Sequence, residues 1–308
     1  MNERDEKILM WEAATLYYEK QHTQQEIAEM MKLSRQTVSR LLNDAVKENI
    51  VEIKVHNPKE DCEELEKRLQ AQFSLRSCVV CGVASKSESV RGLMTVKAAG
   101  EYILPMLSEG GLKIALSWGR TIEQFINALP ELTTSGNTVF PLFGATDNEK
   151  SYFSSNELTR GLAEKIGASA KYAWFPYLAD NAQEWEMLKE LSLYKKMQEL
   201  WKTADLAIVG IGNAEILEIF GATFGYSDRH SQAVGDIATH FFDKDGQLLA
   251  LYDNSLCADA EDLRNARHTI AIAYGNDKAK AIAGALRTGL IDTLITDEYT
   301  ARKILENN

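Results

Sequence analysis

Short apolar segments alternate with longer amphipathic segments from residue 78 to the end of the chain. The apolar segments span four to six residues and are bordered by glycine and polar residues, which predicts strands. They lie at 78–83, 112–116, 138–142, 171–175, 206–210, 269–273 and 293–296. Residues with helical spacing fill 87–108, 120–129, 155–167, 183–203, 277–287 and 297–306. This alternation predicts a Rossmann-like α/β domain, a parallel sheet with helices on both faces.

Residues 238–252 interrupt the alternation. Two apolar segments, 238–242 and 248–252, are separated by a turn at 244–247 with the sequence Lys-Asp-Gly-Gln. A glycine-containing turn between two short apolar segments is typical of an antiparallel hairpin. We therefore expect a small antiparallel insertion within the parallel domain.

Residues 23–41 predict a helix-turn-helix. Thr23 and Glu26 have the spacing of a capping box, and Ser34 is placed to cap a second helix. The small Ala28 lets the second helix cross the first closely. The exposed face of the second helix then carries side chains that reach base edges and phosphates in a major groove. The predicted DNA-contacting residues are Gln24, Ser34, Arg35, Gln36, Thr37, Ser39 and Arg40.

The segments after this motif suggest how the chain is divided. Residues 50–55 alternate apolar and polar side chains, which predicts a strand and hence a winged helix-turn-helix. Residues 59–72 predict a charged helix with a narrow apolar stripe, which suits either a connector resting on a domain or a dimer-forming linker. A length of 308 residues suggests two domains. We expect a DNA-binding domain at 1–57, a linker helix at 58–75, and an effector-binding and oligomerisation domain at 76–308.

The net charge of −11 is unusual for a protein that binds nucleic acid, but its distribution matters more than its sum. Residues 1–60 hold nine basic and eleven acidic side chains, whereas 32–47 hold four basic and one acidic. Positive charge therefore gathers at the second helix of the motif. One such module neutralises few phosphates and binds weakly, so two or more copies are expected to act together.

Cysteine usage and hydropathy exclude several classes of protein. Cys78 and Cys81 form a CxxC pair, but it lies in a predicted strand, where residues three apart face opposite ways. Neither a second cysteine pair nor histidines at ligand spacing accompany it, so we expect reduced structural thiols, no metal and no cofactor. No apolar run approaches the ~20 residues that span a bilayer, and residues 1–6 are mostly charged. A cytoplasmic protein without membrane association is expected.

Small or polar residues follow several predicted strands, at 117–121, 143–145, 210–213 and 274–278. A glycine at one such junction usually marks only a turn. Four of them at one edge of a parallel sheet favour a polar pocket, because ligands bind beyond the carboxyl ends of the strands. Lys278 is placed to neutralise a phosphate, and Asp236 in a separate tight loop suits paired sugar hydroxyls. The predicted effector-binding residues are Ser117, Trp118, Gly119, Arg120, Thr121, Phe143, Gly144, Gly212, Asn213, Asp236, Asn276 and Lys278.

With these motifs in view, the chain resembles the SorC family of sugar-responsive bacterial transcriptional regulators. The resemblance runs from about residue 11 to 305. It is carried by residues 13–18, 24–28, 33–42, 117–119, 121, 204–212, 233–237, 241–246, 261–264, 278–279, 281–282, 294–298 and 300–301.

The resemblance implies an effector domain related to sugar-phosphate isomerases and a homotetramer, a dimer of dimers, on double-stranded operator DNA. It implies a sugar or phosphosugar effector that weakens operator binding, with phosphate held by residues 117–121 and Lys278, and Asp236 facing the ligand. The chain departs from the family pattern at Ala145 and Tyr274, where the family commonly has glycine, and at Arg120, where it often has threonine. These departures bear on which effector binds.

Three functions are compatible with a helix-turn-helix joined to an α/β domain with a pocket. A DNA-binding regulator of a carbohydrate-utilisation operon, controlled by a sugar or phosphosugar and without enzymatic activity, accounts for both the motif and the pocket. An isomerase or deaminase with an appended DNA-binding module would use Asp236 and His240 as acid and base, but a second converging base and an oxyanion partner are missing. A scaffold protein would show no response to small molecules. The sequence leaves open the operator and whether the effector activates or represses.

Overall fold

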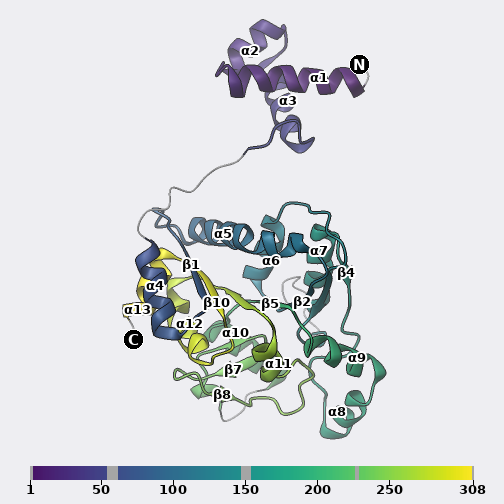
Figure 1. Ribbon diagram of the computed structural model, residues 1–308, viewed down its shortest axis with the longest axis vertical. Helices are drawn as coiled ribbons and strands as arrows, with labels where there is room; N and C mark the ends of the chain where they lie inside the picture. Colours follow the sequence, from purple (N-terminus) through teal and green to yellow (C-terminus); the bar gives the residue numbers. More distant parts are fainter. Residues whose placement is uncertain (1–2, 54–61, 147–153, 226–228, 307–308) are drawn as a thin grey trace. The chain divides into compact units, whose positions relative to one another are not determined.

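The computed structural model describes residues 3–53, 62–146, 154–225 and 229–306. The chain divides into two compact units, Met1–Pro58 and Lys59–Asn308, and each has its own hydrophobic core. Figure 1 shows the helices and strands of both units, coloured along the sequence.

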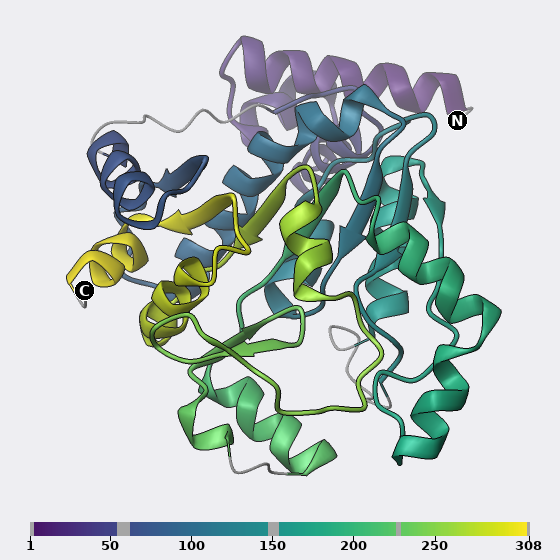
Figure 2. The ribbon, with the colours of Figure 1, turned by 60° about the horizontal axis from the view of Figure 1, so that its bottom comes forward.

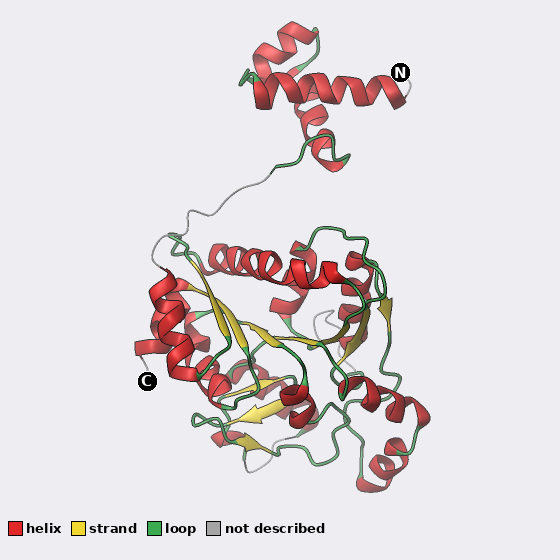
Figure 3. Cartoon of the chain, in the orientation of Figure 1, coloured by secondary structure: helices red, strands yellow, loops and turns green. Residues whose placement is uncertain are grey.

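The first unit is helical, as Figure 3 shows. It consists of α1 (Glu3–Ala14), a π-helical turn η1 (Thr15–Glu19), α2 (Gln24–Met31) and α3 (Arg35–Lys47). The predicted caps are present: Thr23 and Glu26 form a capping box, and the Ser34 side chain accepts the N–H of Thr37. The buried side chains of α2 and α3 share one core with α1, so the predicted helix-turn-helix is confirmed.

The turn between α2 and α3 places a side chain in strained backbone. Lys32 has a φ of 54° and lies in the left-handed region, where residues other than glycine are uncommon. Its N–H bonds back to the carbonyls of Ala28 and Glu29, and the Leu33 N–H also reaches Ala28. These bonds satisfy the last carbonyls of α2 and end that helix.

The strand predicted at 50–55 is not formed within its described part. Asn49 takes a left-handed conformation with a φ of 54°, and the N–H groups of Ile50 and Val51 both return to the Ala45 carbonyl. The side chains of Ile50 and Val51 therefore pack onto the helical core just after the end of α3, instead of belonging to a strand. Residues 50–53 hold no strand, and 54–55 lie outside the described residues, so the predicted wing is not observed.

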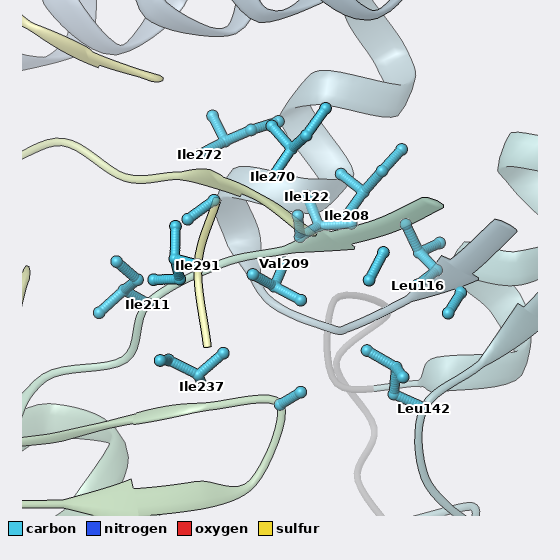
Figure 4. Packing of buried hydrophobic residues seen from close by; sticks show 14 of the residues in the cluster. Leu116, Ile122, Leu142, Ile208, Val209, Ile211, Ile237, Ile270, Ile272 and Ile291 are labelled. Carbon is cyan, nitrogen blue, oxygen red and sulfur yellow. The ribbon is translucent and has the colours of Figure 1, made fainter. Parts of the chain in front are cut away.

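A seven-stranded parallel sheet forms the centre of the second unit, in the order β1-β10-β9-β5-β2-β3-β4. The strands are β1 (Ser77–Cys81), β2 (Lys113–Leu116), β3 (Thr138–Pro141), β4 (Ser169–Ala170), β5 (Leu206–Val209), β9 (Thr269–Ile272) and β10 (Thr293–Asp297). Figure 4 shows Ile208 and Ile270 on one side of the sheet near Ile122, and Val209 on the other. Burial on both faces explains why these strands are continuously apolar.

Layers of helices cover both faces of the sheet (Figures 1 and 2). One layer holds α5 (Glu88–Glu109), α6 (Arg120–Ala128) and α7 (Ser155–Ile166). The other holds α10 (Ala214–Phe224), α12 (Ala279–Arg287) and a small antiparallel sheet of β6 (Gly235–Ile237), β7 (His240–Phe242) and β8 (Leu248–Leu249). The pairing of β7 with β8 confirms the predicted hairpin, and β6 adds a third strand.

Near the β1 end of the sheet, α4 (Cys62–Phe73) and α13 (Glu298–Glu306) lie side by side (Figures 1 and 2). The apolar stripe of α4 is Cys62, Leu65 and Leu69, and all three side chains are buried in the core of the second unit. This packing agrees with a connector resting on a domain, and the dimer-forming alternative stays a prediction.

Two other predictions differ from the structure. Residues 171–175 are not a strand: β4 is shorter and earlier, because this edge strand pairs only with Thr138 and Val139 of β3. The predicted helix at 183–203 is two helices, α8 (Ala182–Lys189) and α9 (Ser192–Trp201), separated where Leu191 is extended. Two helices were not predicted, α10 and α11 (Ala260–Asn265). No disulfide joins the four cysteines, all of which lie in the described residues. Within the described residues, no helix is both long and apolar enough to cross a membrane.

Candidate ligand pocket and nucleic-acid interface

A cavity of about 190 Å³, called the pocket below, lies beyond the carboxyl ends of β2, β5 and β9. This volume is below the roughly 300–1,000 Å³ of pockets for drug-sized molecules, so it suits a small ligand. Eight of the twelve predicted residues line it: Trp118, Gly119, Arg120, Thr121, Gly212, Asn213, Asp236 and Lys278. The parallel sheet brings seven of them together because adjacent strands end at the same edge, and Asp236 comes from β6 of the small antiparallel sheet.

Three helical N-termini meet at the pocket. They begin after Gly119 for α6, after Asn213 for α10, and after Gly275 for the 3-10 turn η4 (Asn276–Lys278) that precedes α12. None of these three positions has a side-chain capping bond among the described residues. Uncapped N–H groups and the positive ends of helix dipoles therefore face the space where a ligand would lie, which favours hydroxyl oxygens or an anion.

The charged side chains of the pocket are two cations, Arg120 and Lys278, and four carboxylates, Glu88, Glu215, Asp236 and Asp277. Arg120 and Glu215 form an ion pair of 2.9 Å at the mouth, with both side chains 60% exposed. An ion pair this exposed is weak, so a ligand can replace either partner. Deeper in, the Lys278 ammonium donates to the Ile211 carbonyl at 3.1 Å, and burial together with the nearby Arg120 charge lowers the pKa of Lys278.

Asp236 provides a buried carboxyl group at the base of the pocket, with 3% of its surface exposed. Burial raises the pKa of Asp236 to about 6, against the opposing effects of the Thr239 N–H at 3.0 Å and the Lys278 charge. A Cβ at position 212 would overlap the Asp236 Oδ1, so Gly212 is needed for this carboxyl to reach the pocket. The β6–β7 turn at Ala238 and Thr239 has φ values of 47° and 73°, which is strained backbone of the kind found at functional sites.

Four predicted residues support the walls and do not line the pocket. The Ser117 hydroxyl accepts the Gly210 N–H at 3.0 Å and so ties the β2 loop to the β5 loop. Phe143 packs edge-on against Trp118, with ring centroids 4.7 Å apart. Gly144 is closed in by the backbone of Pro176 and Tyr177. The Asn276 side chain accepts from Arg91 at 3.5 Å.

Ten lining residues were not predicted: Glu88, Gln124, Gly210, Ile211, Glu215, Ile216, Ile219, Ala238, Tyr274 and Asp277. Four of these, at 210, 211, 274 and 277, lie in strand-end loops that the sequence did indicate. Glu215, Ile216 and Ile219 belong to the unpredicted helix α10. Tyr274 closes one side by donating its hydroxyl to Gln124 at 2.6 Å, and its ring fills the space beside Gly92.

The acid–base pair of the enzyme alternative is not assembled. His240 is absent from the lining of the pocket, and burial lowers its pKa to about 4. Its Nε2 atom is buried without a hydrogen-bond partner among the described residues. A neutral imidazole behind the wall does not meet the geometric requirement for proton transfer to a ligand at Asp236.

In the first unit, Arg35, Gln36 and Arg40 are exposed, whereas Val38 and Leu41 on the other side of α3 are buried. Gln24, Thr37 and Ser39 are half-buried, and Ser34 is exposed. The Ser34 and Thr37 hydroxyls lie 2.7 Å apart and take part in the helix cap. Gln24 and Arg35 line one surface hollow together with Tyr17, Gln21, His22, Thr23 and Gln25. The exposed end of α3 thus presents two guanidinium groups and an amide.

Both units of the chain are similar to known proteins. A family model described as a putative sugar-binding domain matches residues 57–306, and one described as sigma-70, region 4, matches residues 2–48. The sorbitol operon regulator of Klebsiella pneumoniae is 30% identical over 99% of this chain and 100% of its own length. The deoxyribonucleoside regulator of Bacillus subtilis (strain 168) is also 30% identical, over 99% of each chain. The crystal structure of the full-length sorbitol operon regulator superimposes with a TM-score of 0.77 and 29% identity, over 99% of each chain.

Proposed function

Because the chain belongs to the SorC family of sugar-binding transcriptional regulators, we propose that it controls a carbohydrate-utilisation operon and that a sugar or phosphosugar in the pocket controls its operator binding. The observation that carries this proposal is the pocket itself, which gathers eight predicted ligand-binding residues at one edge of the sheet. The same chain carries a helix-turn-helix with an exposed basic face.

The proposed operator contacts come from the N-terminal part of α3. Arg35, Gln36 and Arg40 are exposed and have the chemistry to bind guanine, adenine and phosphate. Gln24, Ser34, Thr37 and Ser39 would hold the helix against the DNA backbone. A single motif neutralises few phosphates, so we propose that a homo-oligomer, as a dimer of dimers, places several copies on one operator.

The proposed effector contacts divide by chemistry. Asp236 would accept hydroxyl groups of the ligand at the base of the pocket, where few water molecules compete. The N-termini of α6 and α10 would donate N–H groups, and Lys278 with Arg120 would neutralise a phosphate if the ligand carries one. The exposed Arg120–Glu215 pair can open to admit that phosphate at little cost.

Thermal unfolding of the full chain with sugars, polyols and their phosphate esters tests the proposal. A ligand at 100 times its Kd adds about 2.7 kcal/mol of stability, which raises the melting temperature by several degrees. If the ligand is a phosphosugar, Lys278→Ala removes the shift and Lys280→Ala, an exposed lysine outside the pocket, keeps it. A shift with unphosphorylated sugars alone assigns Lys278 to hydroxyl binding. No shift with any compound contradicts the proposed effector.

A further inference from the structure

Beside the pocket, three buried polar residues join three elements of the second unit. Arg91 on α5 is 3% exposed, and Asp297 at the end of β10 and Thr300 on α13 are fully buried. The Arg91 Nε lies 3.3 Å from Asp297 Oδ1, an ion-pair contact in which Nε makes no hydrogen bond among the described residues. The same oxygen accepts the Thr300 N–H at 3.1 Å, and Asp297 Oδ2 accepts the Thr300 hydroxyl at 2.5 Å. Breaking either Thr300–Asp297 bond would leave a buried polar group unpaired, so Asp297 and Thr300 hold one arrangement, with the Arg91 charge beside them.

The Thr300 hydroxyl also reaches the wall of the pocket. It accepts the Gly275 N–H at 3.0 Å while donating its own proton to Asp297, so both functions of the hydroxyl are used. Gly275 lies between two residues that line the pocket, Tyr274 and Asp277. Arg91 adds a second tie at the next residue, where it donates to Asn276 Oδ1 at 3.5 Å. Two consecutive residues that support the pocket wall, Gly275 and Asn276, are therefore bonded to this buried cluster.

On its other side, the cluster leads to the helix nearest in sequence to the DNA-binding unit. Thr300 lies in the first turn of α13, which contacts both η4 in the pocket wall and α4. Figures 1 and 2 both show α13 beside α4. The buried Leu65 and Leu69 of α4 share the core with Ile304 of α13. A movement of residues 274–278 that keeps the Thr300 bond must therefore move α13, and α4 packs on α13.

We propose that Thr300 is a positioning residue that joins the pocket wall at 274–278 to α13 and thereby to α4. In functional terms, which rest on the function proposed above, ligand occupancy would reach α4 through this hydroxyl. The joint transmits position because the Thr300 hydroxyl is buried and uses its hydrogen bonds to Gly275 and Asp297 together, so the wall and the helix shift together.

Hydrogen exchange of the ligand-free, full-length protein tests the joint. Thr300→Val removes the hydroxyl and keeps the shape of the side chain, whereas Thr300→Ser keeps the hydroxyl. Thr296→Val is the matched control, because Thr296 is also fully buried but its hydroxyl has no partner among the described residues. We expect Thr300→Val to speed amide exchange at least tenfold both in residues 274–279 and in α4, while Thr300→Ser and Thr296→Val stay at the wild-type rates.

A milder variant keeps the test decisive if Thr300→Val does not fold. Asn276→Ala removes the exposed partner of Arg91 and so cuts only the second tie; it should speed exchange about threefold in the same two segments. Faster exchange at 274–279 with unchanged α4 would overturn the proposal, as would an equal effect of Thr296→Val. Because the measurement uses neither ligand nor DNA, a silent thermal-shift panel counts only against the proposed effector, and unchanged α4 exchange counts only against the joint.

Discussion

The proposed DNA-contacting face of α3 and the proposed effector pocket are built in opposite ways. The face of α3 uses side chains from a few consecutive residues, 35–40, and its charged members project into solvent. The pocket uses residues from position 88 to 278, and its key carboxyl, Asp236, is buried behind Gly212. A substitution on α3 should therefore remove one contact and leave the fold unchanged, whereas a substitution in the pocket should change ligand binding and stability together.

The largest effect is expected from Asp236→Asn. Since the pKa of Asp236 is raised from 3.8 to about 6, the folded protein holds this proton more tightly than the unfolded chain does. The stability due to this group is therefore fully present below about pH 4 and is lost as the pH rises to about 6. At pH 7 the neutral amide should raise the unfolding free energy of the ligand-free protein by up to about 3 kcal/mol, while ligand binding is lost.

Urea unfolding of the two proteins at pH 4 and pH 7 measures this difference, and the thermal-shift panel measures binding. Asp277→Asn is the control, because that carboxyl also lines the pocket but is exposed. It should change stability by less than about 0.5 kcal/mol. Equal stability of Asp236→Asn and wild type at both pH values would show that the ionised Asp236 does not destabilise the folded protein. The pocket would then resemble the face of α3, where a substitution leaves the stability of the fold unchanged.

Gly212→Ala should also destabilise the pocket and the fold together. The added methyl group meets Asp236 Oδ1, and the neighbouring Ile216 Cβ is only 3.2 Å away, so the hairpin or α10 must shift. We expect a loss of about 1–3 kcal/mol in unfolding free energy together with weaker ligand binding. Gly161→Ala is the control, since a Cβ there meets only Ile126 Cγ2 at 3.6 Å in a helix. If both variants unfold at the same denaturant concentration, the close approach of Gly212 to Asp236 does not contribute to the unfolding free energy.

Arg35→Ala tests the opposite side of the comparison. Removing an exposed guanidinium from α3 should cost about 1–3 kcal/mol of specific operator affinity, with the melting temperature within a degree of wild type. Fluorescence anisotropy at fixed salt measures the affinity, and Lys47→Ala at the far end of α3 should lose much less. Unchanged operator affinity in Arg35→Ala would remove the role proposed for this residue.

Sequence patterns identified the first unit almost completely because its signals are local. The caps at Thr23 and Ser34 and the apolar face of α3 lie within a few residues of the backbone that they organise. The strand prediction was wrong at 50–53 for the same reason: an alternating pattern cannot reveal whether a partner strand exists. The Asn49 turn folds Ile50 and Val51 onto the helices instead.

The pocket was only partly predictable, because half of its wall depends on tertiary packing. The loops after β2, β5 and β9 were recognised from glycine and polar residues at strand ends. Helix α10 was missed because residues 214–224 are apolar on nearly every side, so no periodic stripe marks a helix. Glu88 lies on a predicted helix, but only the packing of α5 beside Tyr274 directs it to the pocket.

The smallest effect is expected at the turn of the helix-turn-helix, where the backbone preference of a single residue can be measured by itself. Lys32 holds a left-handed conformation with a φ of 54°, which costs a residue with a Cβ about 1–2 kcal/mol and costs glycine almost nothing. Glycine also loses more backbone entropy on folding, so Lys32→Gly should stabilise the first unit by only about 0.5–1 kcal/mol. Urea unfolding, monitored by hydrogen exchange of the α2 amides, measures this gain in stability. Lys20→Gly is the control: Lys20 has a right-handed backbone conformation, so glycine there should lower the stability. A loss in Lys32→Gly as well would mean that the Lys32 side chain stabilises the turn through contacts that outweigh its strain. In that case a side chain of the first unit would also stabilise its fold, as we expect for the side chains of the pocket.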